Sequence, residues 1–248
     1  MNYLKITNNN IETERICCAL SGKQGALKKA WLKQQFGAGL VYYRSAEPGN
    51  CFVEYLPAEN AWVPILAPGY LYLNCLWVTG LLKGHGCSNS LLGECIRDAK
   101  EQGKNGLCIL SAVGRKREFL ADPKYLAYKG FLAADTSSCG ITLYYLPLKP
   151  EAEPPLFKSC AKHPKTEKNG FVIYYTNQCP IAYYWVPRVQ QAAAEHNIPL
   201  KIIHLTSKTA AQNAPTPVTT YALFQNGEFV TQTVQSPKTF LARAGVKF

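Results

Sequence analysis

Long apolar runs are missing from this chain of 248 residues. No stretch approaches the roughly 20 consecutive apolar residues that a membrane-spanning helix needs. The first residues, MNYLKITNNNIE, hold no apolar signal core. Because 47% of the residues are hydrophobic and 17% are charged, the composition is typical of a globular chain with a sizeable core. We therefore expect a cytoplasmic protein of one large or two small domains, with no membrane partner.

Metal-ligand clusters are missing as well. The chain has four histidines and ten cysteines, and no two cysteines have C-x-x-C spacing. Cys17 and Cys18 are adjacent, and the other cysteines are scattered singly. Neither a zinc site nor a disulfide framework is indicated, so we expect no metal ion and mostly buried free thiols.

Acidic residues are in short supply. The chain has 16 Asp and Glu against 27 Lys and Arg, which leaves a net charge of +11. A basic balance favours anionic ligands through long-range attraction. The chain has no basic arm, zinc finger or RNP-like motif, so we expect no nucleic-acid partner.

What the sequence does contain is a glycine-rich turn after an apolar strand. Residues 70–78 (YLYLNCLWV) precede residues 82–92 (LKGHGCSNSLL), where a helix starts at Cys87 and runs to about Gln102. Gly84 and Gly86 permit a tight turn and close approach of a ligand. The helix start directs amides and a positive dipole at that turn, which favours an anion. The spacing is neither a P-loop nor G-x-G-x-x-G, so a plain strand-to-helix turn stays an alternative.

The first part of the chain alternates strands and helices. A helical region over residues 11–36 is interrupted by Gly22 and Gly25, which predicts two short helices. An α/β sheet with helices on both faces is expected. The remaining elements are strands at 40–45, 51–56, 70–78, 106–111 and 140–146, and a helical stretch at 116–129 that Pro123 breaks.

Five prolines and many charges fill residues 147–168, which predicts a linker between domains 1–146 and 169–248. Asn226-Gly227 is a strong hairpin signal within the second domain. The order expected there is strand 171–175, helix 180–197, strand 200–205, short helix 206–213, strands 219–225 and 228–234, and a final helix after Ser236-Pro237.

Two features carry a family resemblance. Residues 83–88 (KGHGCS) resemble the pyrophosphate motif [RQ]-x-x-G-x-[GA] of GNAT N-acetyltransferases, with Lys83 in place of Arg or Gln and Ser88 in place of Gly or Ala. The order βαβαββα of the second domain, with Pro187 eight residues after Cys179, resembles thioredoxin. Together the two halves are similar to YoaP-type acetyltransferases, in which a GNAT domain precedes a thioredoxin-like domain. The similar segments are 54–59, 61–65, 75–78, 122–131 and 177–180.

The resemblance implies an acyl-CoA-dependent N-acyltransferase and implies little about the acceptor. Our leading hypothesis is transfer of an acetyl group from acetyl-CoA to a primary amine of a small acceptor, by direct attack in a ternary complex. The resemblance leaves the oligomeric state open. It assigns the pyrophosphate to the glycine turn, the pantetheine and the oxyanion to the strand before it, and the adenine or the core to Tyr128. The expected acetyl-CoA residues are Leu76, Trp77, Val78, Lys83, Gly84, His85, Gly86, Cys87, Ser88, Asn89 and Tyr128.

Proton carriers are expected on either side of the reacting groups. Glu54 and Glu59 are the candidate bases, although Glu54 could instead pair with a lysine. Tyr125 is the candidate acid, one residue out of register with the family, whose tyrosine corresponds to Leu126. Asn74 could bond the acceptor or face its neighbour strand.

Cys179 stands at a helix start before Pro180, where the dipole favours a thiolate. Ala182 replaces the second cysteine of a dithiol site, which argues against dithiol chemistry. A monothiol or structural role remains for Cys179, and Cys87 has the same two alternatives. Two competing hypotheses are a non-catalytic module that senses CoA or binds a partner, and a monothiol redox protein.

Overall fold

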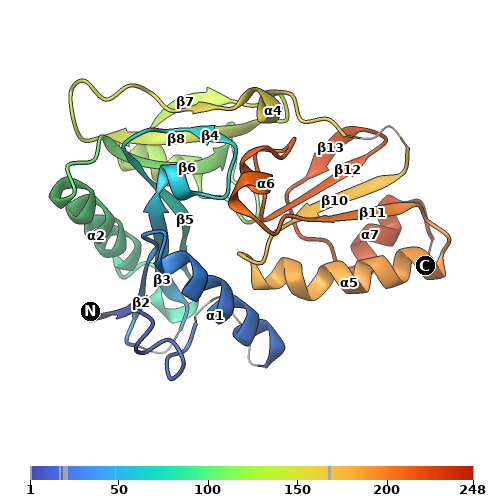
Figure 1. The fold of residues 1–248 in the computed structure, drawn as a ribbon, viewed down its shortest axis with the longest axis horizontal. Helices are drawn as coiled ribbons and strands as arrows, with labels where there is room; N and C mark the ends of the chain where they lie inside the picture. Colours follow the sequence, from blue (N-terminus) through green and yellow to red (C-terminus); the bar gives the residue numbers. More distant parts are fainter. Residues whose placement is uncertain (1, 17, 19–21, 48, 167–168, 248) are drawn as a thin grey trace.

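The computed structural model describes residues 2–16, 18, 22–47, 49–166 and 169–247. Two sheets lie side by side (Figure 1). The larger has the strand order β1-β2-β3-β5-β6-β8-β7, and the smaller has the order β11-β10-β12-β13. Within the described ranges, no helix has both the length and the apolar character needed to cross a bilayer.

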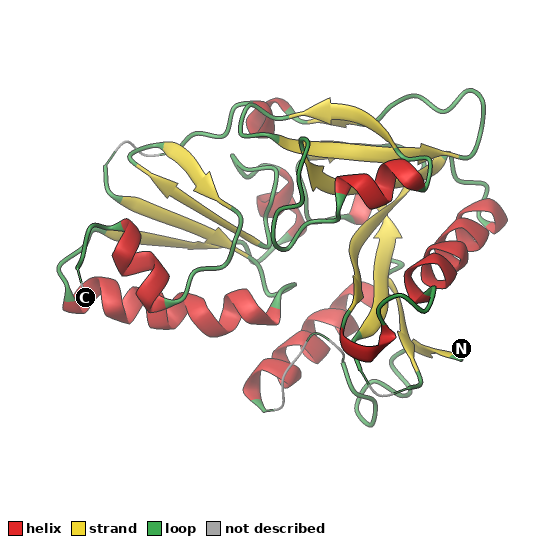
Figure 2. Ribbon diagram, turned by 180° about the vertical axis from the view of Figure 1, so that it is seen from behind, coloured by secondary structure: helices red, strands yellow, loops and turns green. Residues whose placement is uncertain are grey.

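The large sheet is covered by helices on both faces, as predicted (Figures 1 and 2). Neighbouring residues of one strand face opposite layers: Phe52 packs in the cluster that holds Leu32 of α1, and Val53 packs in the cluster that holds Leu91 of α2. This is the alternation of a strand that is buried on both sides. The elements are β1 (Tyr3–Ile6), α1 (Lys23–Phe36), β2 (Val41–Ser45), β3 (Cys51–Pro57), η1 (Ala58–Asn60), β4 (Ile65–Leu66), β5 (Tyr70–Val78), η2 (Gly80–Leu82), α2 (Cys87–Glu101), β6 (Gly106–Ala112), α3 (Pro123–Tyr128), β7 (Leu132–Thr136) and β8 (Ile141–Pro147).

Three local features differ from the predictions. The helix expected from residue 11 is replaced by turns over the described residues 7–14. There the side chain of Asn10 accepts a hydrogen bond from the Thr7 amide at 2.8 Å, and such local bonds compete with a helix. The rest of that expected helix falls partly on residues 17 and 19–21, outside the described residues. The edge strands β1 and β7 were not predicted, because neither segment shows a clean apolar alternation.

The second unit has the predicted element order. Strands β10 and β11 are parallel, and β12 and β13 form the antiparallel hairpin at Asn226-Gly227, where both turn residues have positive φ. Pro187 lies inside α5, as expected. The elements are β10 (Phe171–Tyr175), α5 (Pro180–Glu195), β11 (Leu200–His204), α6 (Lys208–Gln212), β12 (Tyr221–Gln225), β13 (Glu228–Thr231) and α7 (Pro237–Arg243).

The segment expected to be a linker contributes to the first unit. It contains β9 (Leu156–Phe157), which pairs with β4, and the short helix α4 (Ser159–Lys162). Phe157 and Ala161 are buried in the same cluster as Trp31. Proline prevents regular structure only where it stands, and the prolines here flank these two short elements rather than interrupt them.

The two units share their cores. Trp62 of the first unit packs in a cluster with Val172 and Phe224 of the second, and Val218 of the second is buried in the cluster of Trp31. Helices α1 and α5 lie next to each other (Figure 1). The interface is therefore a continuous apolar layer and not a loose contact between surfaces.

Candidate active site

The site begins where two parallel strands part. β5 and β6 pair only from Tyr70 and Gly106 to Tyr72 and Cys108, although β5 continues to Val78. A β-bulge interrupts β5 at this point. Glu54 of β3 pairs with Cys75 of β5, whereas the next residue, Tyr55, pairs with Leu73. Asn74 is therefore the extra residue of β5. A bulge bends its strand and redirects a side chain, so the edge of β5 beyond Tyr72 faces away from β6.

A large cleft of about 560 Å³ follows this parted edge. Its walls come from the last residues of β5, the glycine turn, the first turn of α2, and α3. Ten of the eleven residues expected to bind acetyl-CoA line it, and His85 does not. The ten are Leu76, Trp77, Val78, Lys83, Gly84, Gly86, Cys87, Ser88, Asn89 and Tyr128.

The glycine turn has the backbone that its sequence requires. Gly84 has φ 81° and Gly86 has φ 75°, in a region that only glycine enters without strain. Gly86 caps α2, and its carbonyl oxygen accepts from the amides of Asn89 at 3.0 Å and Ser90 at 3.1 Å. The Ser88 amide, one residue nearer the helix start, has no acceptor within the helix by helix geometry. Lys83 of the turn and Lys116, which the sequence analysis did not single out, both line the cleft. The cleft is therefore lined by the start of a helix and by two lysines.

Cys87 has a structural environment. Its side chain is buried, and its thiol donates to the carbonyl oxygen of Leu82 at 3.2 Å. Its own carbonyl accepts from the hydroxyl of Tyr3 at 3.3 Å. These contacts tie the helix start to η2 and β1, so they favour the structural alternative over a reactive thiol.

Tyr125 projects from α3 into the cleft. The short helix is set by Pro123 in its first turn and by the side chain of Asp122, which accepts from the Lys124 amide at 2.9 Å. Burial raises the pKa of Tyr125, and the nearby Ser88 hydroxyl opposes that effect. The phenol is therefore protonated at neutral pH.

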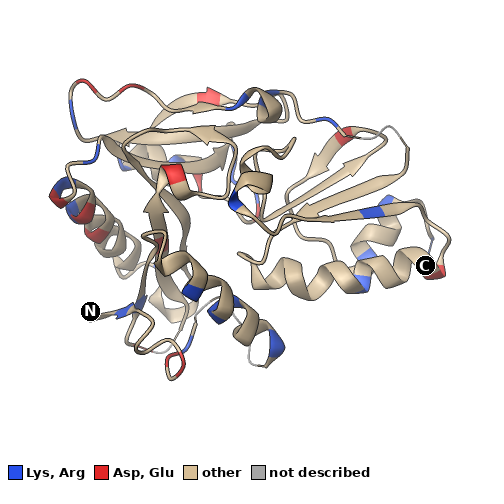
Figure 3. Ribbon diagram, viewed as in Figure 1, with Lys and Arg blue, Asp and Glu red and all other residues tan. Residues whose placement is uncertain are grey.

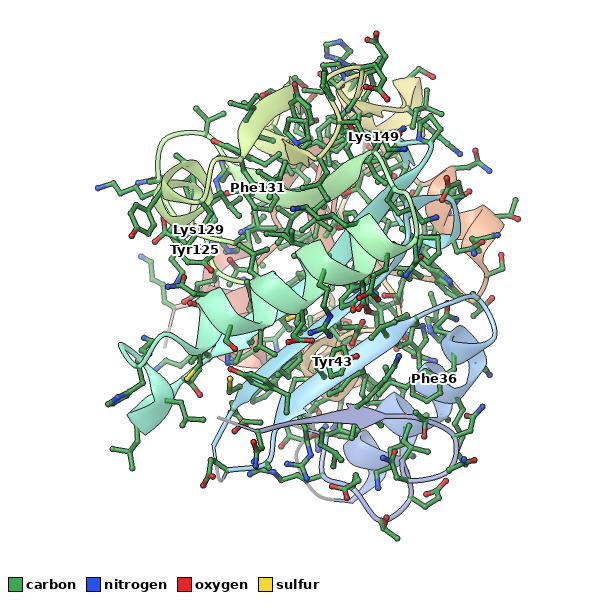
Figure 4. All side chains as sticks on the ribbon, turned by 90° about the vertical axis from the view of Figure 1, so that its left-hand side faces the viewer. Phe36, Tyr43, Tyr125, Lys129, Phe131 and Lys149 are labelled. Carbon is green, nitrogen blue, oxygen red and sulfur yellow. The ribbon has the colours of Figure 1, made fainter. Side chains whose placement is uncertain are left out.

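A basic residue stands beside this tyrosine. Figure 4 shows Tyr125 and Lys129 close together beside α2. The Lys129 ammonium lies 6.0 Å from the ring centre of Tyr125 and 4.6 Å from that of Tyr128. Tyr128 is 79% exposed, so it is a rim residue of the cleft and not a core residue.

A second, smaller cavity of about 60 Å³ adjoins the same strand segment. It shares Leu73, Leu76 and Trp77 with the large cleft. Its other walls include Asn74 and, from the second unit, Gln178 and residues 218–220. The second unit therefore closes one side of the site.

Behind this cavity lies a buried ion pair. Lys28 Nζ is 2.6 Å from Glu54 Oε2, and the two side chains are 2% and 1% exposed. The same ammonium donates to the Gln178 carbonyl oxygen at 2.8 Å and lies 4.3 Å from the ring centre of Trp31. Asn74 Nδ2 donates to Glu54 Oε1 at 2.8 Å. Of the two alternatives left open for Glu54, the structure contains the one in which it pairs with a lysine.

Charge balance governs the protonation of Lys28. Burial alone lowers the pKa of its ammonium, but the Glu54 carboxylate outweighs burial and the pKa is raised overall. Lys28 was not predicted as a site residue. A signal was available: Lys28, Trp31, Leu32 and Gln35 form the buried stripe of α1, so a lysine occupies an apolar face and requires a partner.

The two candidate bases lie outside both cavities. Glu54 is enclosed by its partners and lines neither cavity. Glu59 lies in η1, where its carboxylate accepts from the Gly69 amide at 2.7 Å, and it lines neither cavity either. The structure brings Tyr125 to the cleft but leaves both glutamates away from it.

The thiol of Cys179 is favoured over the thiolate. Burial raises the pKa of Cys179, and the amides of Ala182 and Ile181 at the start of α5 oppose that effect without overcoming it. The amides at the helix start favour the thiolate, as expected, but desolvation of the charged sulfur is the larger contribution. Among the described residues, no group of three or more His, Cys, Asp or Glu side chains is placed to hold a metal ion.

The chain resembles a known protein over nearly its whole length. It is 40% identical over 245 residues to "Uncharacterized N-acetyltransferase YoaP" from Bacillus subtilis (strain 168), and the match covers 97% of each chain. A family model described as YoaP-like matches residues 199–241.

Solved structures resemble the chain less closely. An acetyltransferase of the GNAT family from Staphylococcus aureus Mu50 is 12% identical with a TM-score of 0.42, covering 60% of this chain and 99% of its own. A GNAT-family acetyltransferase from Brucella melitensis, solved in complex with acetyl-CoA, is 17% identical with a TM-score of 0.39, covering 64% and 96%.

Proposed function

The chain belongs to the family of the N-acetyltransferase YoaP and is an acyltransferase, and on this premise we propose that it is a GNAT-type enzyme. It transfers an acetyl group from acetyl-CoA to a primary amine of a small acceptor. The transfer takes place by direct attack in a ternary complex. The observation that carries the proposal is the cleft between the parted strands, which opens onto the glycine turn.

The cleft suits acetyl-CoA along its length. Amides at the start of α2 and the ammonium groups of Lys83 and Lys116 match a pyrophosphate. The edge of β5 from Leu76 to Val78 lies beyond its last pairing with β6, so it offers backbone groups to the amides of pantetheine. When bound, acetyl-CoA supplies the acetyl group as an activated thioester.

Tyr125 is proposed as the general acid. It lines the cleft, and burial keeps its hydroxyl protonated at neutral pH by raising its pKa. As the neutral amine attacks and the C–S bond breaks, a phenol in this state donates a proton to the departing thiolate, and the proton that the nitrogen loses passes to solvent. A backbone amide near Trp77 or Val78 is proposed to stabilise the oxyanion.

Direct attack is supported by the state of the cysteines near the site. The Cys87 thiol is buried and donates to a carbonyl, and burial raises the pKa of Cys75 well above its ordinary value. A thiol held in this way is a poor nucleophile. We assign Glu54 a positioning role through Asn74, and Glu59 no role at this site, because neither glutamate lines a cavity.

The second unit is proposed to be thioredoxin-like. Its element order and the position of Pro187 inside α5 support this proposal. Ala182 in place of a second thiol, together with the raised pKa of Cys179, favours a structural role for the cysteine.

Titration calorimetry with acetyl-CoA tests the cofactor site. The variants are Gly86→Glu, which adds a carboxylate at the glycine turn, and Gly93→Glu, which adds the same charge at an exposed position inside α2. We expect Gly86→Glu to bind at least about tenfold more weakly, a loss of about 1.4 kcal/mol or more. We expect Gly93→Glu to bind like the wild type. Absence of wild-type binding at millimolar acetyl-CoA, or equal binding by the two variants, would reject the site.

A further inference from the structure

The smaller cavity beside β5 contains no charge. Among the described residues that line it, none is Lys, Arg, Asp or Glu. The first turns of α5, which follow Gln178, carry no charged residue either (Figure 3). Lys28 and Glu54, which contact the lining residues Gln178 and Asn74, neutralise each other behind the wall. A carboxylate, phosphate or guanidinium in this cavity would lose its water without gaining a counter-ion. An ammonium would do so too, so the amine enters as the neutral free base, which is its nucleophilic form.

The cavity is also small. Its volume is about 60 Å³, and about 10–15 Å³ of such volume holds one water molecule. The cavity therefore admits a few non-hydrogen atoms, which is the size of a short arm.

The orientation of Asn74 is fixed by chemistry. An ionised carboxylate only accepts hydrogen bonds, so the amide nitrogen of Asn74 must face Glu54, as the 2.8 Å contact has it. The carbonyl oxygen of Asn74 is then turned away from Glu54. Because Asn74 lines the cavity, this oxygen is an acceptor available to an N–H group there.

Gln178 supplies a second carboxamide from the other unit. Its backbone carbonyl is held by Lys28 at 2.8 Å, and the residue lines the cavity while being only 7% exposed. Thr219 stands on the same wall, and its hydroxyl donates to the buried carbonyl of Trp62. One ion pair therefore anchors the carboxamide of Asn74 and the backbone of Gln178, one residue from each unit.

We propose that this cavity is the acceptor site, and that it selects a primary amine on a short and uncharged arm. Asn74 accepts from the amine, and Gln178 from the second unit shapes specificity. The inference rests on the proposed function and extends it by naming the acceptor class. It assigns the second unit a direct part in substrate selection.

The test is acetylation of four probe amines with acetyl-CoA, followed by mass spectrometry. Two probes fit the class, n-propylamine and 2-aminoethanol. Two violate it, n-hexylamine by its length and glycine by its carboxylate. We expect kcat/KM for the first two to exceed that for the others by at least about tenfold, and Gln178→Leu to raise KM for n-propylamine by at least about tenfold. Gln191→Leu, the same change on the exposed face of α5, is the matched control and should leave KM unchanged.

Acetyl-CoA affinity, measured in parallel, separates the two proposals. A protein that fails to bind acetyl-CoA overturns the proposed function. A protein that binds it but prefers glycine or n-hexylamine, acetylates none of the probes, or is indifferent to Gln178→Leu overturns the acceptor class. If Gln178→Leu fails to fold, Asn74→Leu is measured instead and must lower kcat/KM for n-propylamine by at least about tenfold with acetyl-CoA affinity kept.

Discussion

The side chain of Lys28 links three parts of the chain. Its ammonium contacts Glu54 on β3, the carbonyl of Gln178 at the start of α5, and the ring of Trp31 on its own helix. A buried charge is costly to desolvate, and it is tolerated only when its partners are in place. The pair therefore ties the fold of the first unit to the position of the second.

Removing one member of this pair should destabilise the protein strongly. We expect Lys28→Met to lower the free energy of unfolding by about 3–5 kcal/mol, because it leaves the Glu54 carboxylate buried without a counter-ion. The double variant Lys28→Met with Glu54→Gln removes both charges and should recover most of that loss. Urea unfolding followed by circular dichroism measures both. A single variant as stable as the wild type would show that the pair is not buried as described.

The pair should also give a defined pH dependence. The folded pKa of Lys28 is raised above its unfolded value of about 10.4. The stabilisation of the folded state by the Lys28 ammonium is therefore fully present below about pH 10, and it is lost as pH rises through the folded pKa. We expect the stability difference between the wild type and the double variant to stay constant from pH 7 to 9 and to shift against the wild type above about pH 10.5. The ionisation of buried tyrosines cancels in this difference, and a shift below pH 9 would contradict the assignment.

At the scale of single elements, α2 contains glycines of two kinds. Gly86 caps the helix with φ 75°, and Gly93 lies inside it at an exposed position with open space for a Cβ. We expect Gly86→Ala to cost about 1–2 kcal/mol through backbone strain and Gly93→Ala to gain about 0.5–1 kcal/mol through lower chain entropy. Urea midpoints measure both changes in stability. If both variants were stabilised, or both destabilised, the backbone conformations assigned to the two glycines would be wrong.

The sequence predicted those elements whose signals are local. The glycine turn with α2, the buried strands β5 and β6 and the hairpin at Asn226-Gly227 all carry their own pattern of apolar residues and turn formers. The edge strands β1 and β7 depend on a neighbouring strand for pairing, and neither segment carries a pattern of its own. The short strand β9 exists because β4 lies beside it. Whether such a segment forms a strand depends on pairing with a strand elsewhere in the chain, and no local sequence pattern indicates that pairing.

The candidate site divides in the same way. Most of the 22 cleft residues come from one stretch of about twenty residues and from α3, and the sequence named half of the 22 as site residues. The ion pair joins residues 26 positions apart, and the contact with Gln178 spans 150 positions. The bulge at Asn74 arises from a register shift against β3. No spacing along the chain indicates these three features.

At the scale of the whole molecule, the two units should unfold together. Thr219 of the second unit donates to the carbonyl of Trp62, whose ring packs in the core of that unit. We expect a single transition in which tryptophan fluorescence and circular dichroism coincide. Thr219→Val should lower the free energy of that whole transition by about 1–3 kcal/mol, because it leaves a buried carbonyl without a donor. Two separate transitions would mean that the shared core does not couple the units.

The wall that residues 218–220 contribute to the acceptor cavity has a consequence for biosynthesis. The ribosome completes the acetyl-CoA cleft, which ends at Phe131, long before it adds these residues. A nascent or prematurely terminated chain therefore holds every residue of the cleft but lacks this wall of the proposed acceptor cavity. On that proposal, selection of the amine requires nearly the whole chain to have been translated.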